Sequence, residues 1–197
     1  NKNNPWNSKA IPTPVLKTAG TDRYYHLLAG EDERQGGALL FFNLKQPLPI
    51  TDAQPEYPSS ADFLLAAKKL PNAHVDVEKP FWWDVPMWIA SKQVDSIGLC
   101  NNHLQRNGML SNEAWGKPRP RIRYPDPHGN GLWSQDLYYR LLESGHRIPP
   151  SAGSASGVLP NPVGYNRVYL HCGSKLDYNA WWEGLRAGRV VVTNGPL

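Results

Sequence analysis

The chain alternates short apolar segments with segments of helical periodicity. Val75 and Val77 alternate with His74, Asp76 and Glu78, which predicts a strand with one apolar and one polar face. The expected strands cover residues 24–29, 38–44, 73–78, 96–100, 167–171 and 189–193. Capping residues delimit the expected helices: Ser59 or Ser60 with Pro71, Ser134 with Gly145, and Asp177 with Gly188, with a shorter helix over residues 84–91.

Strands separated by helices predict β-α-β units and a mostly parallel sheet, so the expected fold class is α/β. No glycine-rich phosphate-binding motif follows any expected strand, which argues against a nucleotide-binding fold. The long segment over residues 101–133 follows a strand, and β/α barrels build their sites from such segments. The choice between an open doubly wound sheet and a barrel stays open at this point, because about six strand-helix units or fragments of them are visible, short of the eight of a full barrel.

Composition supports one folded domain over residues 1–197. Hydrophobic residues make up 40% of the chain and include eight Trp, which excludes a disordered segment, and Gly and Pro number 17 and 19, which predicts long loops. The formal charge of +4 is mild and scattered, so a nucleic-acid partner is not expected. No apolar run is long enough for a membrane span. Cys100 and Cys172 lack metal-ligand spacing and are expected to be free, buried thiols.

Polar side chains follow several expected strands. Glu31, Glu78, Lys79, His103 and His171 occupy such positions, and carboxylate and imidazole groups gathered at strand ends suit a divalent metal that activates water. Each has a simpler interpretation: Glu31 as a solvated turn residue, Glu78 with Lys79 as a surface ion pair, His103 as a loop cap. His74 starts its strand, at the opposite end, and is expected to be structural.

Two further groups have open interpretations. Arg119 and Arg121 alternate with prolines in residues 117–123, where they could bind an anion or simply form a solvated loop. An aromatic group could stack on a sugar or pack in the core; it comprises Phe81, Trp82, Trp83, Trp88, Trp181 and Trp182. Ser154 lies in a small-residue turn that resembles a nucleophile elbow, but Ala155 stands where that motif needs serine, so a serine hydrolase is not expected.

The ending WWEGLRAGRVVVTNGPL, residues 181–197, resembles the late motif of CehA/McbA-like metallohydrolases, a branch of the polymerase and histidinol phosphatase (PHP) superfamily. Residues 145–154 and 164–169 resemble the same branch, and residues 83–86 fit it more loosely, so the resemblance spans about residues 24–197. It implies a distorted PHP-type β/α barrel, incomplete in this chain, whose divalent Zn, Mn or Fe hydrolyses an ester or phosphoester.

The resemblance also assigns residues. Glu31 matches the bridging glutamate of the family, His103 matches a histidine after a middle strand, and Glu78 falls where the family has a His-Pro pair. The first His-x-His motif is absent, which suggests a fragment of a larger protein that has additional domains. Residues 152–157 lack the Asp and His of the late Ala-Gly-Ser-Asp-x-His motif.

The function expected from these residues is therefore a reduced metal site that hydrolyses a small-molecule substrate. Glu31, Glu78 and His103 would ligate the metal, Lys79 and His103 would take part in catalysis, and the substrate-binding residues would be Asn102, Ser154, Arg119 and Arg121. The alternative is a catalytically silent PHP-like barrel that binds a carbohydrate or another protein, because a shared fold does not imply shared chemistry. Localisation is not predicted, except that removal of a signal peptide would make the protein periplasmic or secreted.

Overall fold

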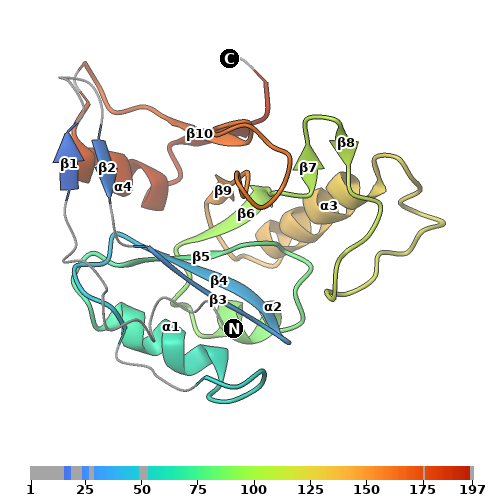
Figure 1. Cartoon of the computed structure of the whole chain (residues 1–197), viewed down its shortest axis with the longest axis horizontal. Helices are drawn as coiled ribbons and strands as arrows, with labels where there is room; N and C mark the ends of the chain where they lie inside the picture. The colour runs from blue at the N-terminus through green and yellow to red at the C-terminus, as the bar shows by residue number, and fades with distance from the viewer. Residues whose placement is uncertain (1–15, 19–23, 27–28, 49–52, 175, 196–197) are drawn as a thin grey trace.

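The protein is described by a computed structural model that covers residues 16–18, 24–26, 29–48, 53–174 and 176–195 (Figure 1). The strands are β1 (Leu16–Thr18), β2 (Tyr24–His26), β3 (Gly30–Arg34), β4 (Gly37–Phe42), β5 (His74–Val77), β6 (Ser96–Cys100), β7 (Leu104–Gln105), β8 (Gly108–Met109), β9 (Pro150–Ala152), β10 (Arg167–Leu170) and β11 (Val190–Thr193). The helices are α1 (Ser60–Lys68), α2 (Val85–Ala90), α3 (Gly129–Glu143) and α4 (Tyr178–Arg186).

A five-stranded mixed sheet is the centre of the fold, with strand order β3-β4-β5-β6-β9. β3 and β4 form an antiparallel hairpin, and β4 also runs antiparallel to β5. β5, β6 and β9 are parallel, and α2 and α3 lie in the two connections between them. β10 pairs with β11 in a separate antiparallel sheet.

One face of the sheet is buried in an apolar core. Leu39 and Phe41 of β4 and Val75 and Val77 of β5 are fully buried on this face, where α1 and α2 cover them. These residues lie two apart along each strand, so their side chains leave the same side of the pleat. Trp88 of α2 belongs to the same core and also donates a hydrogen bond to the hydroxyl of Ser60 at the start of α1, at 2.9 Å.

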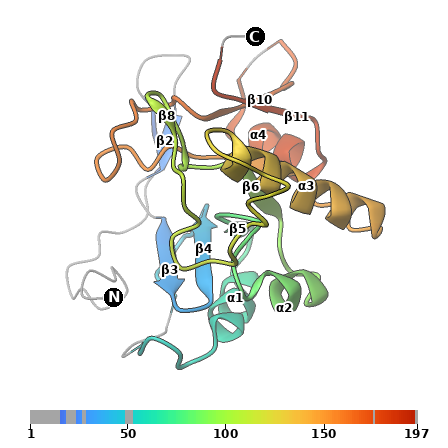
Figure 2. The same cartoon turned by 90° about the vertical axis from the view of Figure 1, so that its right-hand side faces the viewer.

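The other face of the sheet is covered in part by α4 and β10. Figures 1 and 2 show α4 on the opposite side of the sheet from α1 and α2. α4 begins at its N-cap Asp177, whose carboxylate accepts a hydrogen bond from the backbone N–H of Ala180 at 2.7 Å. This layer presents Trp181 and Trp182 toward the polar face of β5 and leaves space between them.

The prediction of a PHP-type β/α barrel is wrong. The described residues form an open mixed sheet and separate two-stranded sheets, and no closed barrel is present among them. The physical reason lies in the hairpin of residues 30–42: β3 and β4 are joined by a tight turn at Gln35 and Gly36, which makes them antiparallel, whereas a barrel strand would be followed by a helix. Only two connections within the five-stranded sheet join parallel strands, far fewer than closure requires.

Most individual elements were predicted correctly. β4, β5, β6, β10 and β11 lie within or next to the expected strands, and α1, α2 and α4 match the expected helices. α3 starts at Gly129, five positions before the expected cap at Ser134. β3 was not expected, since its sequence Gly-Glu-Asp-Glu-Arg was interpreted as a turn.

Two smaller expectations can be compared with the described residues. Among them no helix has the length and apolar character needed to cross a lipid bilayer. Cys100 and Cys172 are both free thiols, as expected, with Cys100 buried and Cys172 half-buried. Burial raises the pKa of the Cys100 thiol to about 11, so it is protonated and unreactive.

Candidate functional site

A cleft of about 570 Å³ lies between the polar face of the five-stranded sheet and the layer formed by α4 and β10. Its floor consists of residues of β3, β4, β5, β6 and β9, together with the residue that follows β5. The floor residues are Glu31, Leu40, Phe42, His74, Asp76, Glu78, Ser96, Gly98 and Ser151. The register joins them across the sheet, because Glu31 pairs with Leu40, Leu40 with Asp76, and Asp76 with Ser96.

A chain of buried hydrogen bonds crosses the centre of this floor. The hydroxyls of Ser96 and Ser151 both donate to Oδ1 of Asp76, Ser96 at 2.5 Å. Ser96 Oγ also lies 2.7 Å from Nε2 of His74. Since these four residues come from β5, β6 and β9, the chain links all three parallel strands of the sheet.

Burial determines the protonation of the two titratable groups in this chain. It raises the pKa of Asp76 from its ordinary 3.8 to about 7, although the hydrogen bonds from Ser151 and Ser96 oppose the rise. Burial lowers the pKa of His74 from 6.5 to about 4, with smaller effects from Asp95, which raises it, and from Arg186 and Lys68, which lower it. His74 is therefore neutral near pH 7, and Asp76 is partly protonated.

Aromatic rings form the wall that faces one end of the floor. Trp182 of α4 packs against His74, with ring centroids 4.9 Å apart, and against Phe42 at 6.3 Å. Trp181 meets Trp182 edge to face at 4.9 Å. Both tryptophans line the cleft and are half-buried.

Three carboxylates gather at the other end of the floor. Glu31 and Glu33 lie on the same face of β3, Glu78 follows β5, and one oxygen from each lies within 4.8 Å of the other two. Glu78 forms an ion pair with the buried ammonium of Lys79 at 2.5 Å and accepts a hydrogen bond from the amide of Asn102 at 2.9 Å. Lys79 pairs directly with Glu78, and its charge also lowers the pKa of Glu31 and of Glu33, against the larger effect of burial.

Their protonation reflects this crowding. Burial, followed by the negative charges of Glu78 and Glu33, raises the pKa of Glu31 from 4.5 to about 7. Burial and Glu78 also raise the pKa of Glu33. A cation placed among the three oxygens would favour their charged forms instead.

Gly98 of β6 allows the strands to approach at this part of the cleft. A Cβ atom at this position would lie 2.0 Å from the carbonyl oxygen of Glu78, so no side chain fits without displacing the backbone. The backbone of Glu78 is thus held close to β6.

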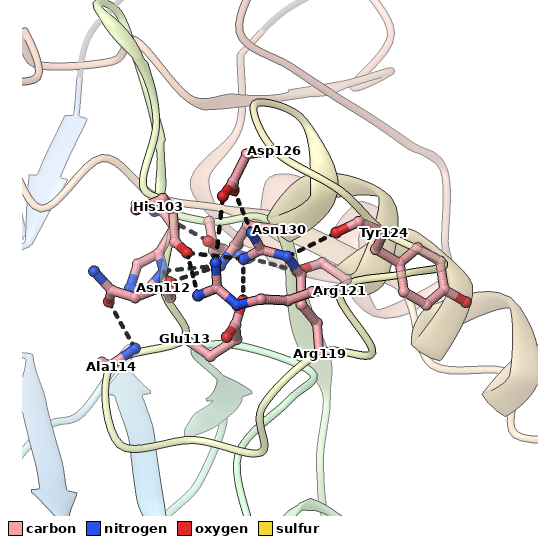
Figure 3. Close-up of polar contacts among 12 residues, drawn as sticks. His103, Asn112, Glu113, Ala114, Arg119, Arg121, Tyr124, Asp126 and Asn130 are labelled. Atoms are coloured by element: carbon pink, nitrogen blue, oxygen red, sulfur yellow. Dashed lines mark hydrogen bonds and ion pairs between the residues drawn. The ribbon is translucent and has the colours of Figure 1, made fainter.

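His103 is not a member of the carboxylate cluster found among the described residues, and Figure 3 shows it near Asn112 and Asn130. Its ring packs against Phe81 at 5.5 Å, and Nδ1 lies 3.1 Å from the carbonyl oxygen of Asn112. Burial and the charge of Lys79 lower the pKa of His103 to about 4. The structure therefore brings Glu31, Glu78 and Lys79 together, but among the described residues His103 does not join their cluster.

Arg119 and Arg121 lie in the long segment that follows β6, where Figure 3 shows them beside Glu113 and Asp126. The buried guanidinium of Arg119 pairs with Glu113 and Asp126 and donates to the backbone carbonyl of Tyr124 at 2.9 Å. Arg121 is exposed and pairs with Asp126 at 3.3 Å. Arg119 thus cross-links its own loop, and neither side chain lines the cleft.

Asn102 and Ser154 take different positions. Asn102 lines the cleft, and its Oδ1 is buried with no hydrogen-bond partner within the described ranges. Ser154 Oγ is buried and accepts a hydrogen bond from the backbone N–H of Asn166 at 2.8 Å. Asn166 in turn donates to three backbone carbonyls nearby, so Ser154 belongs to a hub that holds the loops together.

Sequence reasoning missed the centre of the cleft. His74 was expected to be structural, and Asp76, Ser96 and Ser151 were not considered as site residues. The signal that could have found them is the strict alternation along residues 73–78, because a strand with three polar residues on one face must present them to water, a ligand or other polar groups.

Comparisons of the chain with protein-family models, with curated proteins and with solved structures found no match. The likeness to the CehA/McbA-like branch therefore stays a prediction made from sequence motifs, and the cleft must be interpreted from its own chemistry.

Proposed function

We propose that the cleft binds a neutral, polyhydroxylated small molecule such as a carbohydrate. The observation that supports this best is the combination of an aromatic wall, Trp181 and Trp182, with a polar floor in one cleft of about 570 Å³. Sugar rings have apolar C–H faces that stack on aromatic side chains and hydroxyls that bond to polar ones. The sequence also predicted carbohydrate binding as an alternative function, but on a β/α barrel, which the described residues do not form.

Charge favours a neutral ligand over an anionic one. Glu31, Asp76 and Glu78 line the cleft, and no Lys or Arg is among the described residues that do so. A phosphoester or carboxylate would meet carboxylates at short range in a partly desolvated site, where repulsion is strong. With the pKa of Glu31 and of Asp76 at about 7, these groups can donate or accept a hydrogen bond to a hydroxyl.

Unpartnered acceptors in the lining support a polar ligand. Nδ1 of His74 and Oδ1 of Asn102 are both buried and lack a hydrogen-bond partner among the described residues, and both residues line the cleft. Buried polar atoms in folded proteins are nearly always paired with protein, water or ligand groups. Hydroxyl groups are suitable partners, because each can donate to such an acceptor and still accept elsewhere.

Titration calorimetry with D-glucose, D-galactose, D-mannose and N-acetyl-D-glucosamine tests the proposal. We expect at least one sugar to bind, and Trp182→Ala to weaken that binding about tenfold by removing a stacking surface. Trp83→Ala is the matched control, because Trp83 is 52% exposed and lies outside the cleft lining. Absence of binding by any sugar, or equal losses in the two variants, would contradict the proposal.

A second candidate is metal-dependent hydrolysis of an ester or phosphoester, which the carboxylate cluster favours. Glu31, Glu33 and Glu78 offer three oxygens within 4.8 Å of one another, a donor set that suits Mn²⁺ or Mg²⁺ better than Zn²⁺. A bound divalent ion supplies a water of lowered pKa as nucleophile. Asn102 and Lys79, which both contact Glu78, would orient that carboxylate.

Titration with Mn²⁺ tests this candidate. Glu31→Gln should weaken Mn²⁺ binding about tenfold or more, whereas Glu143→Gln, an exposed position on α3, should not. Mn²⁺-dependent hydrolysis of bis(p-nitrophenyl) phosphate or p-nitrophenyl acetate should be lost in parallel. A wild-type protein that does not retain Mn²⁺ at millimolar concentration would exclude this candidate.

A further inference from the structure

The hydrogen-bond chain in the cleft floor indicates which nitrogen of the His74 ring carries the proton. Ser96 has one hydroxyl proton, and it donates this proton to Oδ1 of Asp76 at 2.5 Å. The contact of 2.7 Å between Ser96 Oγ and Nε2 of His74 must then use a proton on Nε2. A neutral imidazole has only one N–H, so Nδ1 is left with a bare lone pair.

Asp76 keeps this arrangement in both of its protonation states. Ser96 and Ser151 both donate to Oδ1, so a proton acquired by the carboxyl group can reside on Oδ2 without disturbing either bond. The ring of His74 is neutral because burial lowers its pKa to about 4, against the small opposing effect of Asp95 and together with the positive charges of Arg186 and Lys68. As long as Ser96 donates its proton to Asp76, the proton of the neutral His74 ring stays on Nε2.

Nδ1 is the atom that the protein leaves unsatisfied. His74 is 1% exposed, its Nδ1 has no hydrogen-bond partner in the part of the chain that the structure describes, and the residue lines the cleft beside Trp182. A buried acceptor of this kind is unusual, since most buried polar atoms find a partner. The partner it requires is an O–H or N–H donor that comes from outside the described side chains.

We infer that His74 is a specificity-determining residue of the cleft: its Nδ1 accepts a hydrogen bond from a hydroxyl of the ligand, and the Ser96–Asp76–Ser151 chain holds the ring in the Nε2–H tautomer that this requires. The inference rests on the proposed binding of a polyhydroxylated molecule and identifies one of its contacts. It explains why a histidine stands where an apolar residue would pack equally well against Trp182 and Phe42. A ligand without a donor at this point leaves Nδ1 unpaired and binds more weakly.

The tautomer can be tested without any ligand. In ¹⁵N-histidine-labelled protein, two-bond ¹H–¹⁵N correlations distinguish the protonated nitrogen from the bare one, and we expect His74 to carry its proton on Nε2 from pH 6 to pH 8. Asp76→Asn should keep this tautomer, because the amide oxygen can still accept from both serines. Ser96→Ala should lose the preference. Protonation on Nδ1 in the wild-type protein would overturn the inference.

Ligand recognition is tested with His74→Gln, whose amide nitrogen can still donate to Ser96 but which has no acceptor at the position of Nδ1. For a sugar that binds the wild type, removal of the recognised hydroxyl in a series of deoxy analogues should weaken binding about tenfold in the wild type and leave binding to His74→Gln unchanged. Thermal unfolding verifies that the variant is folded. Equal losses in both proteins for every analogue would overturn the inference and leave carbohydrate binding intact.

Glycerol serves as a probe that is independent of sugar affinity. At molar concentration it should shift the Nδ1 resonance of His74 in the wild type, because a hydroxyl then donates to the bare nitrogen. If no sugar binds but glycerol shifts Nδ1, the carbohydrate function fails and the acceptor role of His74 survives. If neither sugars nor glycerol shift Nδ1, the inference is overturned.

Discussion

The buried carboxyl group of Asp76 makes stability depend on pH in a way that a single substitution can isolate. Burial raises its pKa from 3.8 in the unfolded chain to about 7 in the folded protein. The folded state therefore binds more protons than the unfolded state between these values, and stability falls as pH rises through this window. Asp76→Asn removes the titration while its amide oxygen can still accept hydrogen bonds from Ser96 and Ser151.

The size of the effect follows from the shift. A rise of about 3 pKa units at about 1.4 kcal/mol per unit corresponds to about 4 kcal/mol of stability lost between low pH and pH 8. About 3 kcal/mol of this should fall between pH 4.5 and pH 8. Across that range the free energy of unfolding of Asp76→Asn should increase relative to that of the wild type by about this amount.

The wild type alone would not show this dependence clearly. Burial lowers the pKa of His74 and of His103 from 6.5 to about 4, so each costs stability as pH falls below 6.5, the opposite sign to Asp76. Glu31, with its pKa raised to about 7, acts in the same direction as Asp76. Between pH 4.5 and pH 6.5 the stability changes due to the two acids and to the two histidines largely cancel. Subtracting the free energy of unfolding of the wild type from that of the variant removes the contributions of Glu31, His74 and His103, which both proteins share.

Urea unfolding of both proteins at half-unit steps from pH 4.5 to pH 8 provides the measurement. Asp62→Asn, an exposed position in the first turn of α1, is the control and should differ from the wild type by no more than about 0.5 kcal/mol at every pH. A free-energy difference between Asp76→Asn and the wild type that stays constant with pH would refute the argument that burial keeps this carboxyl group protonated.

Four further substitutions, one of them a control, test other parts of the structure. Arg119→Ala should lower the free energy of unfolding by about 3–5 kcal/mol because it leaves buried acidic and carbonyl groups unpaired, whereas the exposed Arg121→Ala should cost less than about 1 kcal/mol in the same urea titration. Gly37→Ala should prevent stable folding, measured by circular dichroism, since φ is +126° and a Cβ atom would lie 2.3 Å from the Trp82 ring. His103→Ala should leave Mn²⁺ affinity within about twofold of the wild type in calorimetry, because its ring lies outside the carboxylate cluster; a tenfold loss would restore it as a ligand.

Local signals in the sequence predicted the elements well but not their assembly. Caps at Ser59 and Asp177 fixed the starts of two helices, and both side chains accept the expected backbone hydrogen bond. The strand character of residues 30–34 was hidden, because three consecutive acidic residues have low strand propensity and are stabilised here by pairing with β4 and by the bond from Arg34 to Asp32 at 2.5 Å. Because β3 and β4 form an antiparallel hairpin, the sheet is mixed, and the prediction of a β/α barrel, which needs parallel strands, fails.

The site was predicted in part. Glu31, Glu78 and Lys79 are adjacent, as their positions after strands suggested, but the reason differs: Glu31 lies within β3 and reaches Glu78 across β4. The arginines of residues 117–123 show why charge alone predicts little, since Arg119 is 3% exposed in a loop that supplies its own acidic partners. The ion pairs of Arg119 with Glu113 and Asp126 depend on how the loop folds back on itself, which the spacing of charges along the sequence does not predict.

The polar floor of the cleft is difficult to explain by stability alone. The opposite face of the same strands already holds a complete apolar core that includes Phe41, Val75 and Val77. On the cleft face, Asp76 costs about 4 kcal/mol at pH 8 and the unpaired Nδ1 of His74 about 1–3 kcal/mol, whereas apolar residues of similar volume at these positions would cost neither. Buried polar groups that lower stability are expected where a protein binds a ligand or performs chemistry. The floor of this cleft, rather than the arginine loop or His103, is therefore where the function of the protein should be sought first.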